Sequence, residues 1–198
     1  MTQDARASLS ELWYVERYTE HFGIVTRVKE LLYRKKSKYQ LIEVFDTEDF
    51  GRVLFLDRSL MVTERDEFFY HELMAHTVMC AHGDAKDILI VGGGDGGLLR
   101  EILKYPVNTV DIVEIDEEVI KVAKEFFPEL GNSFNDARAN LMITDGAEYA
   151  KSCKKKYDAI FLDVSEMTGL PPIGPAEILT GFEFLSNISK LLTPSGIV

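Results

Sequence analysis

The stretch that decides the fold is Ile88-Leu89-Ile90-Val91-Gly92-Gly93-Gly94-Asp95-Gly96-Gly97. Its four apolar residues predict a buried strand, and its glycines predict a tight turn that opens a helix. In open parallel sheets, ligands bind at such turns, beyond the carboxyl ends of the strands. The stretch therefore predicts a nucleotide-type binding turn, although a glycine-rich turn by itself leaves the ligand open.

Strands and helices alternate from this turn onward. We expect strands at 87–91, 110–113, 141–144 and 159–162, and helices at 97–103, 117–127 and 176–192, with a short helix after Asp145. A further helix is predicted from an N-cap at Thr63 to Gly83. Such alternation requires a parallel sheet with helices on both faces. A last strand only begins at Ile197, so we expect a C-terminus that is truncated.

The residues before this helix read as a small β domain. Short segments rich in Val, Ile, Leu and aromatic residues lie at 24–33, 39–45, 52–56 and 60–62, separated by turn residues. We therefore predict an α/β protein with a Rossmann-like sheet, of the type found in S-adenosylmethionine-dependent methyltransferases. The expected domains are 1–63, the N-terminal β domain, and 64–198, the catalytic domain, incomplete at its C-terminus.

Charge and composition narrow the partners. The chain has 22 Lys and Arg against 33 Asp and Glu, a net charge of −11. This balance argues against nucleic acid or an anionic membrane as the partner, and it suits a cationic small ligand. No stretch reaches the roughly 18–20 apolar residues of a membrane span, the start lacks the apolar core of a signal peptide, and the two cysteines form no CxxC. We expect a cytoplasmic protein.

Two further carboxylates follow predicted strands. Glu114 lies 20 residues after Gly94, where a carboxylate can accept both hydroxyls of an adenosine ribose. Asp145, followed by Gly146, is placed to accept a hydrogen bond from the adenine amino group. Each acid has an alternative role as a helix cap, and for Asp145 both roles are compatible.

Asp95 refines the expected ligand. A carboxylate in the glycine turn opposes a pyrophosphate, which argues against a dinucleotide, and it also repels the carboxylate of S-adenosylmethionine. A sulfonium nucleoside with a bare ammonium tail would be attracted. That description fits decarboxylated S-adenosylmethionine, and it needs no permanently bound cofactor.

At this point the chain resembles the spermidine synthase (polyamine aminopropyltransferase) family. The resemblance covers nearly the whole sequence in order. It rests on Tyr39-Gln40, Phe50-Gly51-Arg52-Val53, Leu56-Asp57, the run from Thr63 to Glu72, the run from Gly92 to Gly97, Leu99-Arg100-Glu101, Val113-Glu114-Ile115-Asp116, Asp145-Gly146, Tyr157-Asp158 and Gly174-Pro175-Ala176-Glu177.

The resemblance implies a transfer of the aminopropyl group to an amine by a dimer or tetramer. It implies that Gln40, His71, Gly92, Gly94, Asp95, Glu114, Asp145 and Gly146 bind the nucleoside co-substrate. It also implies that Tyr70 and Asp163 bind and activate the amine. The chemistry agrees, because an alkyl amine with a pKa near 10.4 must lose a proton before it attacks, and a carboxylate can accept that proton. No metal is needed; the HExxH-like run at His71 separates its histidines by five residues, which places them on different helix faces.

One departure from the family concerns the amine. Relatives follow the catalytic aspartate with a second acid, and here either Glu166 takes that place or an insertion replaces it. Putrescine is the expected acceptor, giving spermidine and 5′-methylthioadenosine; spermidine, agmatine or a longer diamine is the alternative. Two other functions remain open, an S-adenosylmethionine-dependent methyltransferase and a non-catalytic binding protein.

Overall fold

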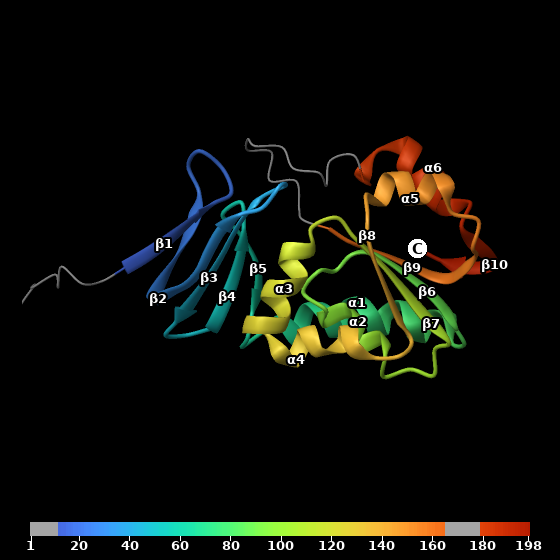
Figure 1. The fold of residues 1–198 in the computed structure, drawn as a ribbon, viewed down its shortest axis with the longest axis horizontal. Helices are drawn as coiled ribbons and strands as arrows, with labels where there is room; N and C mark the ends of the chain where they lie inside the picture. Colours follow the sequence, from blue (N-terminus) through green and yellow to red (C-terminus); the bar gives the residue numbers. More distant parts are fainter. Residues whose placement is uncertain (1–11, 165–178) are drawn as a thin grey trace, which may run out of the picture.

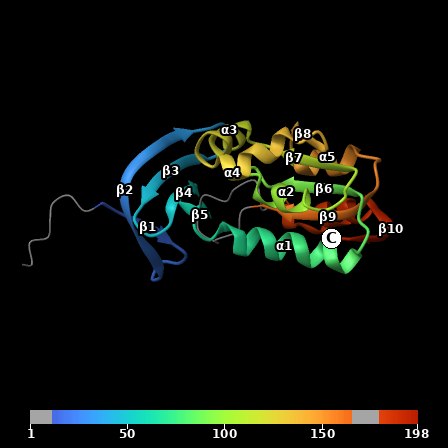
Figure 2. The ribbon, with the colours of Figure 1, turned by 90° about the horizontal axis from the view of Figure 1, so that it is seen from below.

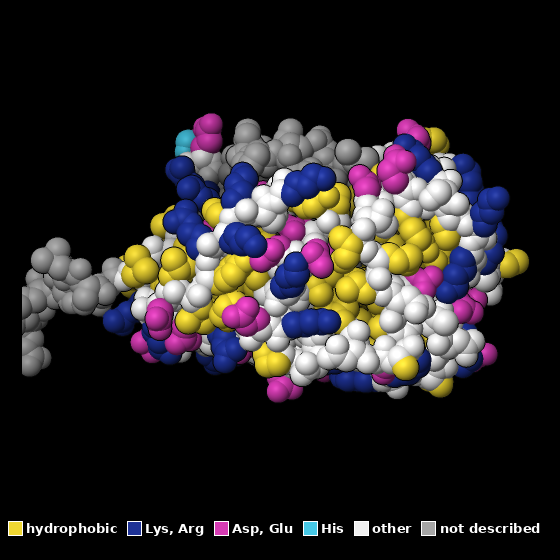
Figure 3. Space-filling model, viewed as in Figure 1, with side chains coloured by type: hydrophobic (Ala, Val, Ile, Leu, Met, Phe, Trp, Pro, Cys, Tyr) yellow, Lys and Arg dark blue, Asp and Glu magenta, His cyan; other side chains and the backbone are white. Residues whose placement is uncertain are grey.

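The computed structural model describes residues 12–164 and 179–198, which form two five-stranded sheets. Figure 1 shows the first sheet at one end of an elongated molecule and the second sheet, wrapped by helices, at the other. Basic and acidic side chains are interspersed on the face shown in Figure 3. No helix in these two described ranges is long and apolar enough to cross a membrane.

The N-terminal sheet is an antiparallel meander in which each strand pairs with the next. Its strands are β1 (Leu12–Arg17), β2 (Gly23–Lys36), β3 (Leu41–Thr47), β4 (Gly51–Leu56) and β5 (Ser59–Thr63). Side chains alternate between its two faces, as the period of two requires. Phe45 and Phe55 pack with β2 on one face, whereas Val44 and Leu54 pack against Leu130 and its neighbours on the other.

The second sheet is parallel, with strand order β10-β9-β6-β7-β8. Its strands are β6 (Asp87–Gly92), β7 (Thr109–Glu114), β8 (Ala139–Ile143), β9 (Tyr157–Asp163) and β10 (Leu192–Ile197). The helices between are α1 (Glu67–His82), α2 (Gly97–Ile102), α3 (Glu117–Phe126), α4 (Pro128–Gly131), the 3-10 helix η1 (Asn132–Asn135), α5 (Gly146–Ser152) and α6 (Phe182–Ser189).

Two apolar layers bury both faces of this sheet. The layer on one face includes residues of α1 and α2, and the layer on the other includes residues of α5 and α6. Figure 2 shows the sheet edge-on with α1 below it and α5 above it. The predicted Rossmann-like fold with a small N-terminal β domain is therefore confirmed. The carboxyl ends of β6, β7 and β9 lie together, because β6 is the central strand between the other two.

The structure corrects three local predictions. Thr63 is not a helix cap: it ends β5, its hydroxyl accepts a hydrogen bond from the Asp66 amide, and α1 begins four residues later at Glu67. The helix expected at 176–192 is α6 over Phe182–Ser189 in the described part, and β10 already begins at Leu192. The last strand, expected to begin only at Ile197, therefore includes Pro194, and its register with β9 is irregular.

The first strand was missed altogether. The sequence prediction began at residue 24, yet β1 pairs with β2 from Leu12 to Arg17. Its signal was present in the alternation of Leu12-Trp13-Tyr14-Val15-Glu16, in which only Tyr14 and Glu16 are turned inward. An acid at an inward position disguised that pattern, because inward positions of a strand are normally apolar.

Candidate functional site

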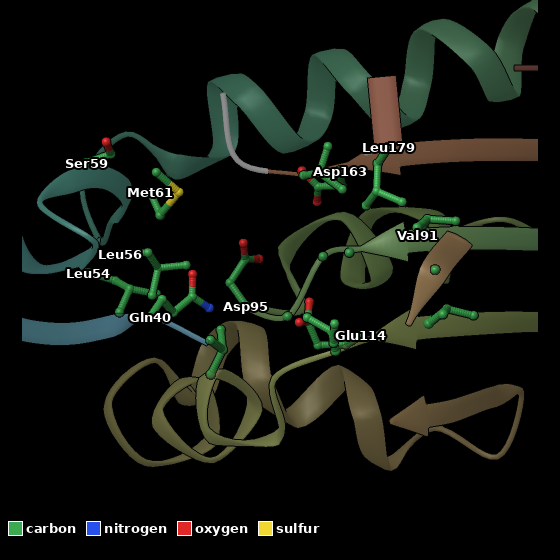
Figure 4. Close-up of a pocket in the computed structure, with 18 of the residues that line it drawn as sticks. Gln40, Leu54, Leu56, Ser59, Met61, Val91, Asp95, Glu114, Asp163 and Leu179 are labelled. Carbon is green, nitrogen blue, oxygen red and sulfur yellow. The ribbon is translucent and has the colours of Figure 1, made fainter. Parts of the chain in front are cut away.

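A cavity of about 410 Å³ lies at the carboxyl ends of β6, β7 and β9 and reaches the N-terminal sheet. Figure 4 shows Gln40, Leu54 and Leu56 on one side of it, Glu114 and Val91 on another, and Asp163 and Leu179 beneath α1. Its size is within the range of pockets that hold small organic ligands, about 300–1,000 Å³. The cavity is therefore the candidate binding site.

The glycine turn brings two strand ends into contact. Gly92 has φ +87°, and a Cβ atom there would lie 1.9 Å from the carbonyl oxygen of Asp163. The same carbonyl oxygen accepts a hydrogen bond of 2.9 Å from the Gly93 amide. Only glycine satisfies both the backbone angle and this approach. The turn therefore sets Asp163 at the mouth of the sheet beside the glycines.

Asp95 follows the glycines and faces the cavity. Its Oδ1 accepts a hydrogen bond of 2.6 Å from the Gly97 amide and lies 3.3 Å from Nε2 of His71. Burial raises the pKa of the Asp95 carboxyl, but the hydrogen bond and charge of His71 and the Gly97 amide lower that pKa by more, so the net pKa is below its usual range. Asp95 is therefore ionised at neutral pH.

Glu114 ends β7 beside the same turn. Its side chain is buried, and its Oε1 accepts a hydrogen bond of 2.8 Å from the Asp116 amide. A Cβ atom at Gly94 would lie 2.9 Å from Glu114 Oε2, so glycine leaves room for the carboxylate. Burial raises the pKa of Glu114 to about 7, against the lowering effect of backbone hydrogen bonds.

Asp163 and Tyr70 meet across the cavity from β9 and α1. The Tyr70 hydroxyl donates a hydrogen bond of 2.8 Å to Asp163 Oδ1, whereas the buried Oδ2 has no hydrogen-bond partner among the described residues. Burial and then the charge of Asp95 raise the pKa of Asp163 to about 6, despite lowering by Tyr70 and His71. Asp163 is thus a partly buried, mostly ionised carboxylate, one oxygen of which lacks a hydrogen-bond donor among the described residues.

Asp145 and Gln40 have their own local partners. Asp145 is the N-cap of α5, and its Oδ1 accepts from the Ala147 amide at 2.7 Å. The alternative role as a helix cap is therefore real, while its contact with an adenine stays a prediction. Gln40 donates from Nε2 to Asp116 Oδ2 at 3.1 Å, which fixes its amide at the edge of the cavity.

Nearly all the residues predicted for the site line this cavity. The predicted residues that line it are Gln40, Tyr70, Gly92, Gly94, Asp95, Glu114, Asp145, Gly146 and Asp163. His71 lines no part of it: its ring is 2% exposed and lies behind Asp95. Glu166 lies outside the described residues.

Sequence reasoning missed the contribution of the N-terminal sheet. The cavity is also lined by Glu16, Tyr18, Ser59 and Leu60. The Glu16 side chain is buried, and its Oε1 accepts a hydrogen bond of 2.8 Å from the Leu60 amide. The only signal was a carboxylate at an inward position of β1. The amide that binds its side chain, that of Leu60, lies 44 residues away in sequence, so no local pattern places Glu16 at the site.

The charge of the cavity is one-sided. Five carboxylates line it, from Glu16, Asp95, Glu114, Asp145 and Asp163, and no Lys, Arg or His is among its described lining residues. An anionic ligand such as a pyrophosphate would be repelled, and a cationic ligand would be attracted. Fold and site together define a Rossmann-like domain with a nucleoside-type turn and an acidic pocket.

Comparison with known proteins gives the family. A family model described as "Spermine/spermidine synthase domain" matches residues 67–198, and one described as "Spermidine synthase tetramerisation domain" matches residues 12–64. The chain belongs to the spermine/spermidine synthase family.

Similar proteins carry the same name across distant organisms. Proteins named polyamine aminopropyltransferase are 43% identical in Methanocaldococcus jannaschii, over 94% of this chain and 62% of the relative, and 40% identical in Bacillus subtilis, over 96% and 67%. A crystal structure of a spermidine synthase in complex with the transition state analogue AdoDATO superposes with a TM-score of 0.86 at 38% identity, covering 92% of this chain and 61% of that one. The chain thus spans about two thirds of the length of these relatives.

Proposed function

We propose that the protein transfers the aminopropyl group of decarboxylated S-adenosylmethionine to an amine, with putrescine as acceptor and spermidine and 5′-methylthioadenosine as products. The observation that carries the proposal is the cavity lined by five carboxylates without a described cationic side chain. Both proposed substrates are cations. The proposal is supported by relatives named polyamine aminopropyltransferases and by the likeness to a spermidine synthase bound to AdoDATO.

The nucleoside part of the co-substrate fits the residues at the ends of β7 and β8. In the proposed complex, Glu114 Oε2 accepts from the ribose hydroxyls, because Oε1 is already occupied by the Asp116 amide. Asp145 accepts from the adenine amino group through the oxygen that does not cap α5. Gly92 and Gly94 let the nucleoside approach the backbone, and Gly146 and Gln40 complete the walls.

The aminopropyl tail fits Asp95. The Oδ2 atom of this carboxylate makes no hydrogen bond to any described residue, whereas Oδ1 is held by Gly97 and His71. A primary ammonium placed at Oδ2 gains a charge-assisted hydrogen bond. The carboxylate of S-adenosylmethionine would lie next to Asp95 at a cost, because two like charges disfavour one another. This difference favours the decarboxylated form.

The transfer step requires a neutral amine and a base. The amine nitrogen attacks the methylene next to the sulfonium, the new N–C bond forms as the C–S bond breaks, and the electron pair goes to sulfur as a neutral thioether. The proton of the attacking nitrogen passes to Asp163, directly or through a water. Tyr70 orients this carboxylate by donating its hydroxyl hydrogen to Oδ1, while Oδ2 is buried beside the glycine turn.

Glu16 fits the distal ammonium of a diamine acceptor. It is the acid of the N-terminal sheet that lines the cavity, so it lies on the side away from the glycine turn. A diamine with one nitrogen at Asp163 and the other at Glu16 satisfies both charges. Glu166 remains the second proposed amine-binding acid. Spermidine, agmatine or a longer diamine is the alternative acceptor.

We also propose that the protein assembles through its N-terminal sheet and acts in the cytoplasm. Half-exposed apolar side chains lie on β1 and β2, namely Leu12, Val15, Ile24 and Val25, and exposed apolar surface of this kind is typical of protein interfaces. The matching family model is described as a tetramerisation domain. Light scattering coupled to gel filtration tests the assembly, and a monomer at micromolar concentration would contradict it.

An amine panel with two co-substrates tests the proposed activity. Radiolabelled decarboxylated S-adenosylmethionine is incubated with putrescine, spermidine, agmatine and cadaverine, and the products are separated. We expect labelled spermidine from putrescine. Methyl transfer from S-adenosylmethionine would instead favour a methyltransferase, and tight binding of the decarboxylated form without any product would favour a non-catalytic binding protein.

A further inference from the structure

A network of charged side chains lies behind the cavity, on the side of Asp95 that faces α1. Its members are Asp95, His71, Glu67 and Arg100. His71 separates Asp95 from Glu67, with Nε2 3.3 Å from Asp95 Oδ1 and Nδ1 2.6 Å from Glu67 Oε2. Arg100 from α2 completes this network, because its guanidinium donates to both carboxylate oxygens of Glu67, at 2.8 and 3.0 Å. This network therefore links Asp95, which lines the cavity, to three residues that do not line it, His71, Glu67 and Arg100.

Both ring nitrogens of His71 face carboxylate oxygens. A neutral imidazole has one donor and one acceptor nitrogen, so this arrangement requires the doubly protonated ring. The charged groups that act on the ring are Asp95 from the glycine turn, Glu67 from its own helix and Asp163 from β9. Burial lowers the pKa of His71, but Asp95 and Glu67 together raise it to about 9.

The ring is held in place by close packing as well as by charge. The His71 side chain is 2% exposed, and a Cβ atom at Gly97 would lie 2.2 Å from its Cε1. The ring thus lies directly on the first turn of α2, where the Gly97 amide donates to Asp95 Oδ1. Two donors from the same side, the ring and the amide, therefore fix one oxygen of Asp95.

We propose that Glu67 is a positioning residue for the transfer reaction: through His71 it fixes Asp95 Oδ1 and so presents Asp95 Oδ2 to the ammonium tail of the co-substrate. Arg100 in turn holds Glu67 by its two-point contact. Neither residue touches the substrate. This inference rests on the proposed function, because it assigns the tail of the co-substrate to Asp95.

Loss of the Glu67 charge should affect binding of the ammonium tail and leave binding of the nucleoside unchanged. Loss of the Glu67 charge removes one of the two anions that keep His71 protonated, and a neutral ring can lose its donor toward Asp95. Asp95 then becomes free to turn, and the ammonium loses its oriented acceptor. The proposed ribose and adenine contacts at Glu114 and Asp145 do not involve this network of charged side chains. Binding of a nucleoside without the aminopropyl tail should therefore not change.

Binding of two ligands to Glu67→Gln tests the proposal. Decarboxylated S-adenosylmethionine and 5′-methylthioadenosine share the nucleoside, and only the first has the ammonium tail. We expect calorimetry to show about tenfold weaker binding of the first and less than a twofold change for the second, as loss of an aligned charge-assisted hydrogen bond implies. Nitrogen NMR of His71 should show its pKa falling below about 9. Glu72→Gln, on the exposed side of the same helix, is the matched control and should change nothing.

Four outcomes would overturn the proposal in distinguishable ways. Equal loss of both ligands means that Glu67 only supports the fold, and unchanged binding of the first ligand with a shifted His71 titration means that His71 does not act through Asp95. If the wild-type protein binds 5′-methylthioadenosine but not decarboxylated S-adenosylmethionine, or neither, the proposed function fails and the inference fails with it. Should Glu67→Gln not fold, Arg100→Lys keeps the charge but loses the two-point contact. It should weaken tail binding selectively, and no selective loss there would equally overturn the inference.

Discussion

Replacement of Asp163 by asparagine should slow the proposed transfer by orders of magnitude and at the same time stabilise the fold. Asp163 carries its charge in a buried place, next to the charged Asp95, with Oδ2 unpaired among the described residues. An asparagine has nearly the same shape, and its amide oxygen can still accept the hydrogen bond of Tyr70. The substitution therefore removes the buried charge and the base while leaving the hydroxyl contact.

The size of the gain follows from the pKa of the carboxyl. A rise from 3.8 to about 6 corresponds to about 3 kcal/mol of unfavourable free energy for the charged form, at 1.36 kcal/mol per pKa unit. The new amide NH2 also needs a partner, and leaving it without one costs about 1–2 kcal/mol. We therefore expect a net gain of about 1–2 kcal/mol in the free energy of unfolding at pH 7.5.

The gain should depend on pH in a defined direction. An acid with a raised pKa in the folded state destabilises that state fully above pH 6 and not at all below pH 3.8, since there both states carry the proton. Asparagine has no such dependence. The stability difference between the variant and the wild type should therefore shrink as pH falls from 6 toward 4.

Denaturant unfolding at pH 7.5 and pH 4.5, with a parallel turnover assay, checks both effects. For a chain of this size, each kcal/mol should raise the melting temperature by about 2–4 °C. Turnover should fall by about 10²–10⁴-fold, the usual contribution of a general base. A variant that is less stable than the wild type at pH 7.5, or equally stabilised at both pH values, would refute the buried-charge reasoning, and retained turnover would refute the role as base.

Three further predictions concern the same cavity. Glu114→Gln should weaken 5′-methylthioadenosine binding by about tenfold in calorimetry while leaving kcat within a few-fold, because one hydrogen-bond acceptor of the nucleoside is lost and the base remains; unchanged affinity would contradict its assignment. The kcat/KM of the wild type should rise with pH through about 6, since Asp163 must be ionised to accept a proton, and this limb should be absent in Asp163→Asn; an identical limb in the variant would assign it to another group. Gly97→Ala should destabilise the fold by about 1–3 kcal/mol, as a methyl forced against the His71 ring overpacks the core; urea unfolding at the wild-type midpoint would contradict the close packing.

The general architecture could be predicted from local patterns. The apolar run ending in Gly92 and its glycine turn mark β6, and the regular return of strands after it marks a parallel sheet. These signals are short-range, because strand period, helix period and turn residues are read within about ten residues. The positions of Glu114 and Asp145 follow from this, since Glu114 ends β7 and Asp145 closely follows β8, and the carboxyl ends of these strands share one edge.

Other features depend on contacts between distant residues. Tyr70 and Asp163 are 93 positions apart, and no sequence pattern shows that the hydroxyl of one reaches the carboxylate of the other. The resemblance to a family suggested the pair, but the unpartnered Oδ2 came only from the structure. Glu16 could not be predicted for the same reason. Its strand forms by pairing with β2, and its carboxylate accepts a hydrogen bond from the distant backbone amide of Leu60.

The position of the His71 ring could not be predicted from the family resemblance alone. The pattern placed it with the cavity residues, while the packing places its ring behind Asp95 and against Gly97. The glycine that makes this possible belongs to the same turn that decides the fold. One run of glycines thus opens α2, lets β6 approach β9, and makes room for a buried cation.

The three central carboxylates differ in how their charge is compensated, and this difference explains what the cavity lacks. Asp95 has a buried cation, His71, and its pKa is lowered. Glu114 and Asp163 have no cation at hydrogen-bond distance among the described residues, and burial raises their pKa values to about 7 and about 6. Electrostatic complementarity therefore remains incomplete at those two positions until a ligand arrives. In the proposed complex, a neutral ribose diol beside Glu114 supplies donors, and a cationic amine beside Asp163 supplies charge as well. Because the arriving charge stabilises the ionised Asp163, binding of the amine should release a proton from this carboxyl near pH 6, which leaves it ready to act as the base.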